Sequence, residues 1–162
     1  MNQPFRIGSA YDVHRLEKGE YIVLAGIKIP CRYKTIAHSD GDVVFHALGE
    51  AFLGSLALGD LGKFFPPNDD KFLNMDSKDI ILFVKEKLHE YNYSILNLDV
   101  SIILETPKLK DYILDMRKNT AEILELDMDQ VSIKAGTNEN LDSIGGSLGI
   151  AAFANVLIFK NK

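Results

Sequence analysis

Residues 38–58, HSDGDVVFHALGEAFLGSLAL, decide how this chain folds. The first five letters contain a helix start signal, because Ser39 is a suitable N-cap and Asp42 falls in the first turn, where the helix dipole favours an acid. From Val43 to Leu58 almost every residue is apolar or small, and Gly59 follows as the expected end of the helix. A helix that is apolar on nearly all sides is buried against more than one layer of structure.

Strand patterns flank this helix on both sides. Residues 5–14 alternate as a strand does, and residues 21–30 are typical of a hairpin, with YIVL and IKIP meeting at Gly26. We expect these segments to form an antiparallel start of the sheet. Further strands are expected at residues 95–104, 131–135 and 151–159, and further helices at residues 80–88, capped by Asp76 or Ser77, and at residues 109–124. This order predicts an α+β fold, with a mixed β-sheet and helices packed on one face.

The segment between the first two helices is rich in turn residues. Residues 59–77, GDLGKFFPPNDDKFLNMDS, contain two glycines, two adjacent prolines and clustered acids. This composition predicts a loop, and the length of the loop makes it a candidate lid over a site.

The composition limits the class of protein. With 162 residues, 46% of them hydrophobic, the chain has the size and apolar content of a single domain spanning residues 1–162. The net charge is −5 and the lysines are scattered among acids, so we expect no nucleic-acid partner. The single cysteine, Cys31, fits a reducing compartment, and the longest apolar run is too short to span a bilayer. We therefore expect a cytoplasmic protein with no membrane partner.

The final strand gives information about assembly. Residues 151–159, AAFANVLIF, are apolar at both strand parities, so both faces of this strand should be covered. The helices can cover only one face of the sheet. We therefore predict a symmetric homo-oligomer in which the other faces of the sheets meet.

Three residues form a candidate metal site. Asp12 and His14 project from the same face of the first strand, because side chains alternate with a period of two. His46 is an ionisable group inside the apolar helix and needs a partner. One carboxylate and two imidazoles are a known ligand set for catalytic zinc, which leaves the fourth position open. The alternative is that each histidine is hydrogen-bonded separately in the core.

Two further clusters suggest phosphate chemistry. His38 and Ser39 precede the central helix, where exposed N–H groups can bind an anion, although simple capping by Ser39 beside an exposed His38 explains the same residues. Thr137 and Glu139 follow a strand in the segment KAGTNE, and a hydroxyl with a carboxylate suits a magnesium diphosphate. The alternative for this segment is an ordinary polar turn.

Four segments, taken in order, resemble the family of 2-C-methyl-D-erythritol 2,4-cyclodiphosphate synthases over nearly the whole chain. They are RIGSAYDVHRL (6–16), AHSDGDVVFHALGEAFLGSLALGDLGKFFP (37–66), DSKDIILFV (76–84) and VSIKAGTNENLDSIG (131–145). The resemblance implies a homotrimer with active sites between subunits, located in a bacterial-type cytoplasm or, if a leader has been removed, in the plastid stroma. It also implies a lyase of the non-mevalonate isoprenoid pathway, which cyclises 4-diphosphocytidyl-2-C-methyl-D-erythritol 2-phosphate and releases CMP.

The resemblance also implies roles for individual residues. Zinc, one ion per subunit, would be bound by Asp12, His14 and His46, and magnesium or manganese with the diphosphate by Glu139. His38 and Thr137 match positions that stabilise the transition state. The substrate-binding positions implied for the cytidine diphosphate-type substrate are Asp12, His14, His38, Ser39, Asp60, Gly62, Phe65, Asp69, Leu104, Lys108, Leu109, Lys110, Gly136, Thr137, Glu139 and Ser143.

The chain departs from the family pattern at three positions. Gly136 precedes Thr137 where the family commonly has paired threonines, which removes one hydroxyl from the nucleotide site. Gly146 stands where an arginine is common, so it supplies no guanidinium for a phosphate, and Leu148 stands where an acid is common. Both changes bear on the binding of a prenyl diphosphate in the central channel of the implied trimer. Two other functions fit the same residues: a metal-dependent phosphohydrolase that uses water as nucleophile, and a trimeric nucleotide-binding protein without catalysis.

Overall fold

The computed structural model describes residues 4–162, so the first three residues of the predicted domain lie outside the described residues. A five-stranded mixed sheet has the order β4-β1-β7-β5-β6, and a hairpin of β2 and β3 forms a second sheet. The strands are β1 (Phe5–Lys18), β2 (Tyr21–Leu24), β3 (Ile27–Pro30), β4 (Tyr33–Ile36), β5 (Tyr93–Ile103), β6 (Val131–Gly136) and β7 (Gly149–Lys160). The α-helices are α1 (Val43–Ser55), α2 (Leu61–Phe64), α3 (Lys78–Glu90), α4 (Ile113–Leu124) and α5 (Asp142–Gly145), with short 3-10 helices η1 (Asp70–Phe72) and η2 (Met128–Gln130).

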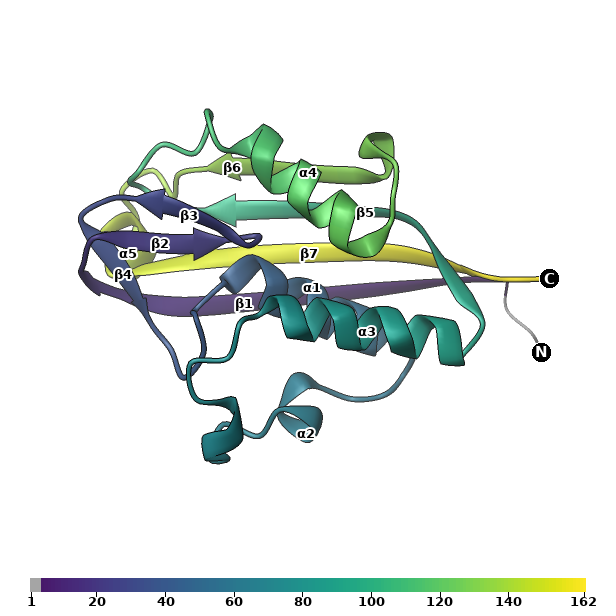
Figure 1. Ribbon diagram of the computed structural model, residues 1–162. Coiled ribbons are helices and arrows are strands. Elements are labelled where there is room, and N and C mark those ends of the chain that lie inside the picture. Colours follow the sequence, from purple (N-terminus) through teal and green to yellow (C-terminus); the bar gives the residue numbers. More distant parts are fainter. Residues whose placement is uncertain (1–3) are drawn as a thin grey trace.

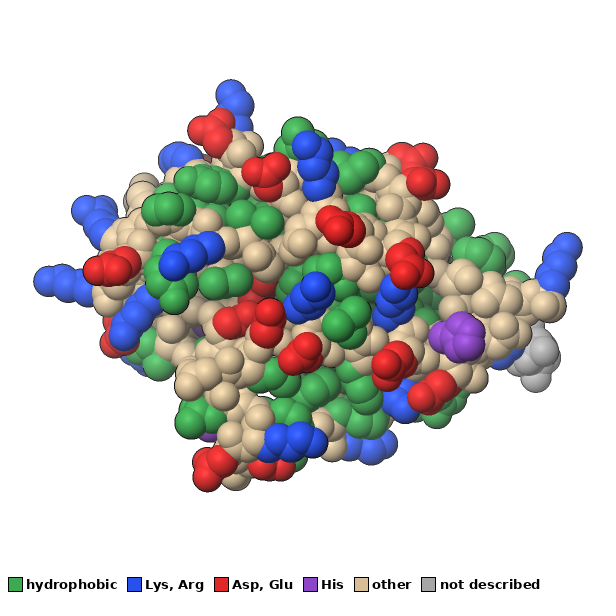
Figure 2. All heavy atoms as spheres, in the orientation of Figure 1, with side chains coloured by type: hydrophobic (Ala, Val, Ile, Leu, Met, Phe, Trp, Pro, Cys, Tyr) green, Lys and Arg blue, Asp and Glu red, His purple; other side chains and the backbone are tan. Residues whose placement is uncertain are grey.

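The long helices cover one face of the large sheet, as the sequence predicts (Figure 1). Helix α1 packs directly on β1 and β7, α3 packs against α1, and α4 packs on β6. Ten of the thirteen residues of α1 are buried, which confirms the prediction of a helix enclosed by more than one layer. On the outer surface, Lys/Arg and Asp/Glu side chains are interspersed over α3 and α4 (Figure 2), as expected for the solvent side of amphipathic helices.

Gly8 allows α1 to lie close to β1. A Cβ atom at Gly8 would lie 1.8 Å from the backbone oxygen of Ala51, so only a glycine fits between the strand and the helix there. This close approach matters for the site, because β1 carries Asp12 and His14 while α1 carries His46.

Several local expectations are wrong at the beginning of the chain. The N-cap of α1 is Asp42, not Ser39, because Gly41 adopts a positive φ of 72° and turns the chain just before Asp42, whose carboxylate accepts hydrogen bonds from the Val44 and Phe45 amides. Helix α1 ends at Ser55 rather than near Gly59. The hairpin of β2 and β3 does not pair with β1, whose neighbours are β7 and β4, a strand that was not predicted.

Later boundaries also differ from the predictions. The expected loop at residues 59–77 contains α2 and η1, and the expected helix at residues 109–124 begins at Ile113. Ser77 stands at the N-cap position of α3 but makes no capping bond, because its hydroxyl faces other partners, and Asp76 accepts from the Lys78 amide instead. The strands β5, β6 and β7 lie where the sequence predicts them, each longer by one to three residues.

The second face of the large sheet is apolar and exposed in the single chain. Every second residue of β1 points to this face. The exposed fraction of the residue is 71% for Ile7 and 50% for Tyr11 in β1, and 47% for Phe153 in β7. The rings of Tyr11 and Phe153 lie side by side, 4.7 Å apart. Large exposed apolar patches of this kind mark interaction surfaces. Among residues 4–162, no helix combines the length and apolar character needed to cross a membrane.

A candidate metal centre and two cavities

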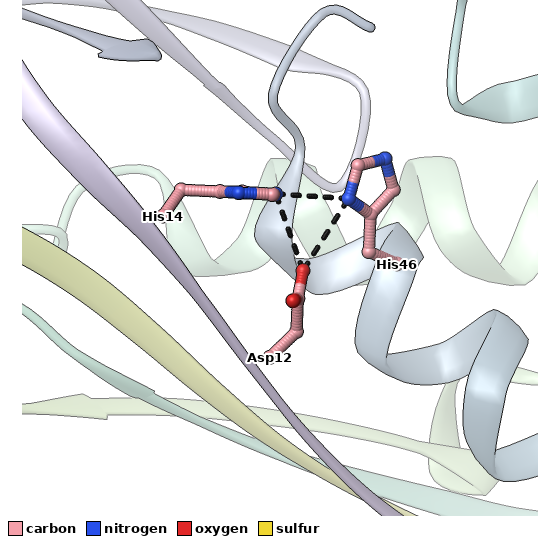
Figure 3. A group of neighbouring side chains, drawn as sticks. All are labelled: Asp12, His14 and His46. Atoms are coloured by element: carbon pink, nitrogen blue, oxygen red, sulfur yellow. Dashed lines mark hydrogen bonds and ion pairs between the residues drawn. The ribbon is translucent and has the colours of Figure 1, made fainter. Parts of the chain in front are cut away.

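Asp12, His14 and His46 point toward one another at the junction of β1 and α1 (Figure 3). The Nε2 atom of His14 lies 3.2 Å from the Oδ2 atom of Asp12, and the Nδ1 atom of His46 lies 3.3 Å from the same oxygen. The two imidazole nitrogens are 2.8 Å apart. The even residues of β1 face the helix layer, and this is why Asp12 and His14 share one face as predicted.

The geometry of this triangle fits a metal ion. Tetrahedral zinc binds nitrogen and oxygen ligands at about 2.0–2.1 Å, which places ligand atoms about 3.3 Å apart. The Oδ2 atom of Asp12 is buried and accepts no well-formed hydrogen bond from the residues that the structure describes. A buried carboxylate oxygen in this state needs a positive partner. The structure therefore brings together the three ligands, and they fit a divalent cation with one open position.

The charges around the triangle favour an ionised Asp12. Burial raises the pKa of Asp12, but contacts with His14 and His46 outweigh this effect and hold the pKa well below its usual range. Glu50 lies one turn after His46 on α1, and burial, together with repulsion from Asp60 and Asp12, raises its pKa, although the Leu61 amide donates to it. A cation in the triangle would relieve this excess of negative charge.

The metal triangle opens into a cavity of about 420 Å³. The cavity is lined by Asp12, His14, Ala37, His38, Ser39, His46, Glu50, Leu61, Gly62, Phe65, Pro67, Phe72, Met75 and Ile80. Besides the metal ligands, this set includes four of the substrate positions that the family resemblance implies, namely His38, Ser39, Gly62 and Phe65. The Nε2 atom of His38 is buried without a hydrogen-bond partner among the described residues, so this side chain is free to meet a ligand.

A second cavity, of about 430 Å³, lies at the ends of β5 and β6. It is lined by Leu104, Pro107, Lys108, Leu109, Lys110, Ile113, Ala135, Gly136 and Thr137, and six of these are among the expected substrate positions, namely Leu104, Lys108, Leu109, Lys110, Gly136 and Thr137. The Oε1 atom of Glu105 accepts from the amides of Asn138 and Asn140, and these bonds hold the turn after β6. The two groups of expected residues thus line different cavities of one chain.

Four expected residues line neither cavity. Asp60 caps α2, and its side chain accepts a hydrogen bond from the Lys63 amide. Asp69 caps η1, and its side chain accepts a hydrogen bond from the Lys71 amide. Glu139 is exposed in the turn after β6, with a positive φ of 53°, and Ser143 is exposed in α5. Within the single chain, these residues do not join the metal triangle.

Three residues next to the triangle were not predicted from the sequence. The position of Glu50 could have been predicted from the sequence, because Glu50 follows His46 by four residues and therefore shares its helix face. Asp40 and Ser77 have no such signal. The Ser77 side chain meets His46, and the Asp40 side chain meets Ser77, because the beginning of α3 docks against the beginning of α1.

Comparison with known proteins extends these observations. Residues 5–159 match the YgbB family. A protein of Acinetobacter baylyi named 2-C-methyl-D-erythritol 2,4-cyclodiphosphate synthase is 46% identical over 153 residues, which is 94% of each chain. The structure of IspF from Plasmodium falciparum, a CDP complex, matches with a TM-score of 0.86 at 32% identity and covers 99% of both chains. The bifunctional IspDF of Campylobacter jejuni matches with a TM-score of 0.93 at 35% identity, covering 98% of this chain but only 43% of that protein.

Proposed function

Because the chain belongs to the YgbB family, we propose that it acts as the 2-C-methyl-D-erythritol 2,4-cyclodiphosphate synthase of isoprenoid precursor biosynthesis. The substrate is 4-diphosphocytidyl-2-C-methyl-D-erythritol 2-phosphate. An oxygen of the 2-phosphate attacks the β-phosphorus, the bond from this phosphorus to the bridging oxygen breaks, and CMP leaves with that oxygen. The observation that carries the proposal is the triangle of Asp12, His14 and His46 at the wall of a cavity.

Two divalent cations belong to this proposal. Asp12, His14 and His46 would hold zinc, and Glu139 would hold magnesium or manganese with the diphosphate. When bound, the cations supply Lewis-acid polarisation of the attacked phosphate and neutralise the repulsion between the two phosphate groups. The protein itself needs no covalent step, because positioning and charge neutralisation account for most of the acceleration of phosphoryl transfer.

The remaining residues would bind and orient the substrate. His38 offers an unpartnered nitrogen and Ser39 a hydroxyl on the wall of the first cavity, where both can contact phosphate. Thr137 would stabilise the transition state from the edge of the second cavity. In that cavity, the segment from Leu104 to Lys110 would receive the cytidine. Asp60, Gly62, Phe65 and Asp69 would meet the erythritol and its phosphate from the segment around α2.

A homotrimer with active sites between subunits completes the proposal. The substrate must contact both cavities, and in one chain they are lined by separate residues, with Glu139 at neither. The exposed apolar face of β1 and β7 is the surface that assembly would cover. Ile7→Asp should give monomers without turnover in sedimentation and activity assays, whereas Leu82→Asp, on the outer face of α3, should remain trimeric. A monomeric and fully active wild-type protein would contradict this assembly.

Phosphorus NMR of the purified protein with the diphosphocytidyl substrate tests the reaction. A cyclic diphosphate together with CMP is the expected result. Open-chain products would identify a phosphohydrolase instead, and bound nucleotide without turnover would identify a binding protein. The proposal also treats residues 1–162 as one catalytic domain, located in the bacterial cytoplasm or in the plastid stroma after removal of a leader.

A further inference from the structure

His46 contacts two serine hydroxyls with the ring nitrogen that does not face the metal triangle. Its Nδ1 atom points to Asp12, whereas its Nε2 atom lies 3.0 Å from the Oγ atom of Ser77 and 3.1 Å from the Oγ atom of Ser39. Ser77 is fully buried at the beginning of α3. Its hydroxyl also lies 2.5 Å from the Oδ1 atom of Asp40. A chain of polar contacts therefore runs from the metal triangle through His46 and Ser77 to Asp40.

The chemistry of Asp40 sets the direction of these hydrogen bonds. An ionised carboxylate only accepts, and Asp40 already accepts from the backbone amides of Asp42 and Ser77. The single hydrogen of the Ser77 hydroxyl must therefore point to Asp40. The Ser77 oxygen then has only lone pairs for His46, so the Nε2 atom of His46 must carry the hydrogen. Since a neutral imidazole carries one hydrogen, Nδ1 is left with the free lone pair that a metal ion requires.

We propose that Asp40 and Ser77 are positioning residues that fix His46 in the tautomer with hydrogen on Nε2, so that Nδ1 is always ready to bind the cation. This inference rests on the proposed function for the identity of the cation, but the tautomer of His46 can be measured without any metal. Hydrogen bonds of this kind behind a metal-binding histidine commonly change metal affinity by about 10- to 100-fold.

Ser39 differs from Ser77 in this arrangement. Its oxygen accepts from the Gly41 amide at 3.2 Å, and no carboxylate directs its hydrogen in the described residues. If His46 donates from Nε2, the Ser39 hydroxyl keeps its own hydrogen and can donate it into the cavity. The same tautomer thus prepares a metal ligand on one side of the ring and leaves a phosphate-binding hydroxyl free on the other.

Nitrogen NMR of the metal-free, full-length protein is the first test. With ¹⁵N-labelled histidine at alkaline pH, long-range proton–nitrogen correlations distinguish the two tautomers, and the His46 signals are assigned from their absence in His46→Ala. We expect hydrogen on Nε2 in the wild type. Hydrogen on Nδ1 in the wild type would overturn the inference whatever the variants do.

Zinc affinity, measured by competition with a chromogenic chelator, is the second test. Ser77→Ala should mix the two tautomers and weaken zinc binding by about 10- to 100-fold, and Ser77→Thr should restore both properties. Ser55→Ala is the matched control, because Ser55 is also a buried serine but donates to the Phe52 carbonyl, away from the site. Zinc affinity of Ser77→Ala within about twofold of the wild type would refute the role of Ser77.

Asp40→Asn keeps the test decisive if Ser77→Ala does not fold. An asparagine amide can donate as well as accept, so the direction of the chain is no longer fixed, and we expect mixed tautomers and weaker zinc binding. Unchanged tautomer and affinity in this variant would overturn the inference. The proposed function fails separately: a wild type that has the expected tautomer and binds zinc but forms no cyclic product would refute the reaction and leave the inference standing.

Discussion

Replacing Asp42 with alanine should destabilise the whole fold, because this carboxylate joins two distant parts of the chain. One oxygen accepts from the amides of Val44 and Phe45, both 3.1 Å away, at the start of α1. The carboxylate also accepts from Ala25 at 3.0 Å and Gly26 at 2.7 Å, in the turn between β2 and β3. The side chain of Asp42 is fully buried, so water cannot replace these contacts.

The expected cost combines two effects. Loss of an N-cap side chain typically destabilises by about 0.5–2 kcal/mol. The amide of Ala25 is buried and would lose its acceptor, which adds about 1–3 kcal/mol. We expect Asp42→Ala to lower the free energy of unfolding by about 1.5–5 kcal/mol, a large part of the total of about 5–15 kcal/mol that is typical of a folded domain.

Urea unfolding followed by circular dichroism measures this loss. Protein concentration must be held constant, because the proposed assembly would add stability. Asp42→Asn should fall between the wild type and the alanine variant, since its amide oxygen still accepts but its NH₂ group opposes a backbone N–H. Asp79→Ala is the control, because Asp79 is an exposed acid in the first turn of α3. A loss below about 1 kcal/mol for Asp42→Ala, or no larger than that of Asp79→Ala, would refute this account of the helix start.

Three further predictions concern the site. His46→Ala should lose bound zinc in elemental analysis and lose turnover while keeping the wild-type circular dichroism spectrum; full activity without zinc would refute the metal assignment. Glu139→Gln should keep zinc but require more magnesium or manganese for turnover, and loss of zinc would show that the division between two metals is wrong. Burial and nearby acids raise the pKa of Glu50, so just above the pKa of an ordinary glutamate this residue holds its proton more often in the metal-free folded protein than in the unfolded chain, and its contribution to stability should fall as the pH rises. Glu50→Gln should reduce that fall in unfolding experiments between acid and neutral pH, and an unchanged pH dependence would mean that Glu50 is not its source.

An element of the fold could be predicted when its own residues carry the pattern, and not when its conformation depends on contacts with distant residues. The apolar residues of α1, the strand pattern of β5 and the continuous apolar run of β7 are visible without tertiary information, and these elements lie close to where they are expected. The strand β4 was missed because it has only four residues, one of them a lysine, and owes its conformation to pairing with the end of β1. The cap of α1 was misplaced because HSDGD offers several suitable residues, and the choice of Asp42 depends on the distant turn of the hairpin.

The site was predictable to a different degree for each residue. The shared face of Asp12 and His14 follows from the period of a strand, but no local pattern places His46 opposite them. Their meeting depends on α1 crossing β1 at the close contact of Gly8 and Ala51. Contacts between Ser77 and His46 lie still further from any local pattern, since they require the beginning of a second helix to dock on the first.

The alternation of β1 links the candidate metal site to the exposed apolar face of the sheet. Asp12 and His14 face the helix layer, whereas Tyr11 and Val13 between them face the open side of the sheet. Antiparallel pairing with β7, which places Asp12 opposite Ala152, sets both faces at once. A shift of one residue in this register would move the candidate metal ligands to the exposed apolar face and the apolar residues to the site. The exposed apolar face and the candidate metal site therefore depend on the same strand register, and a substitution that disturbs the packing of Tyr11 on Phe153 should also displace the candidate ligands beside it.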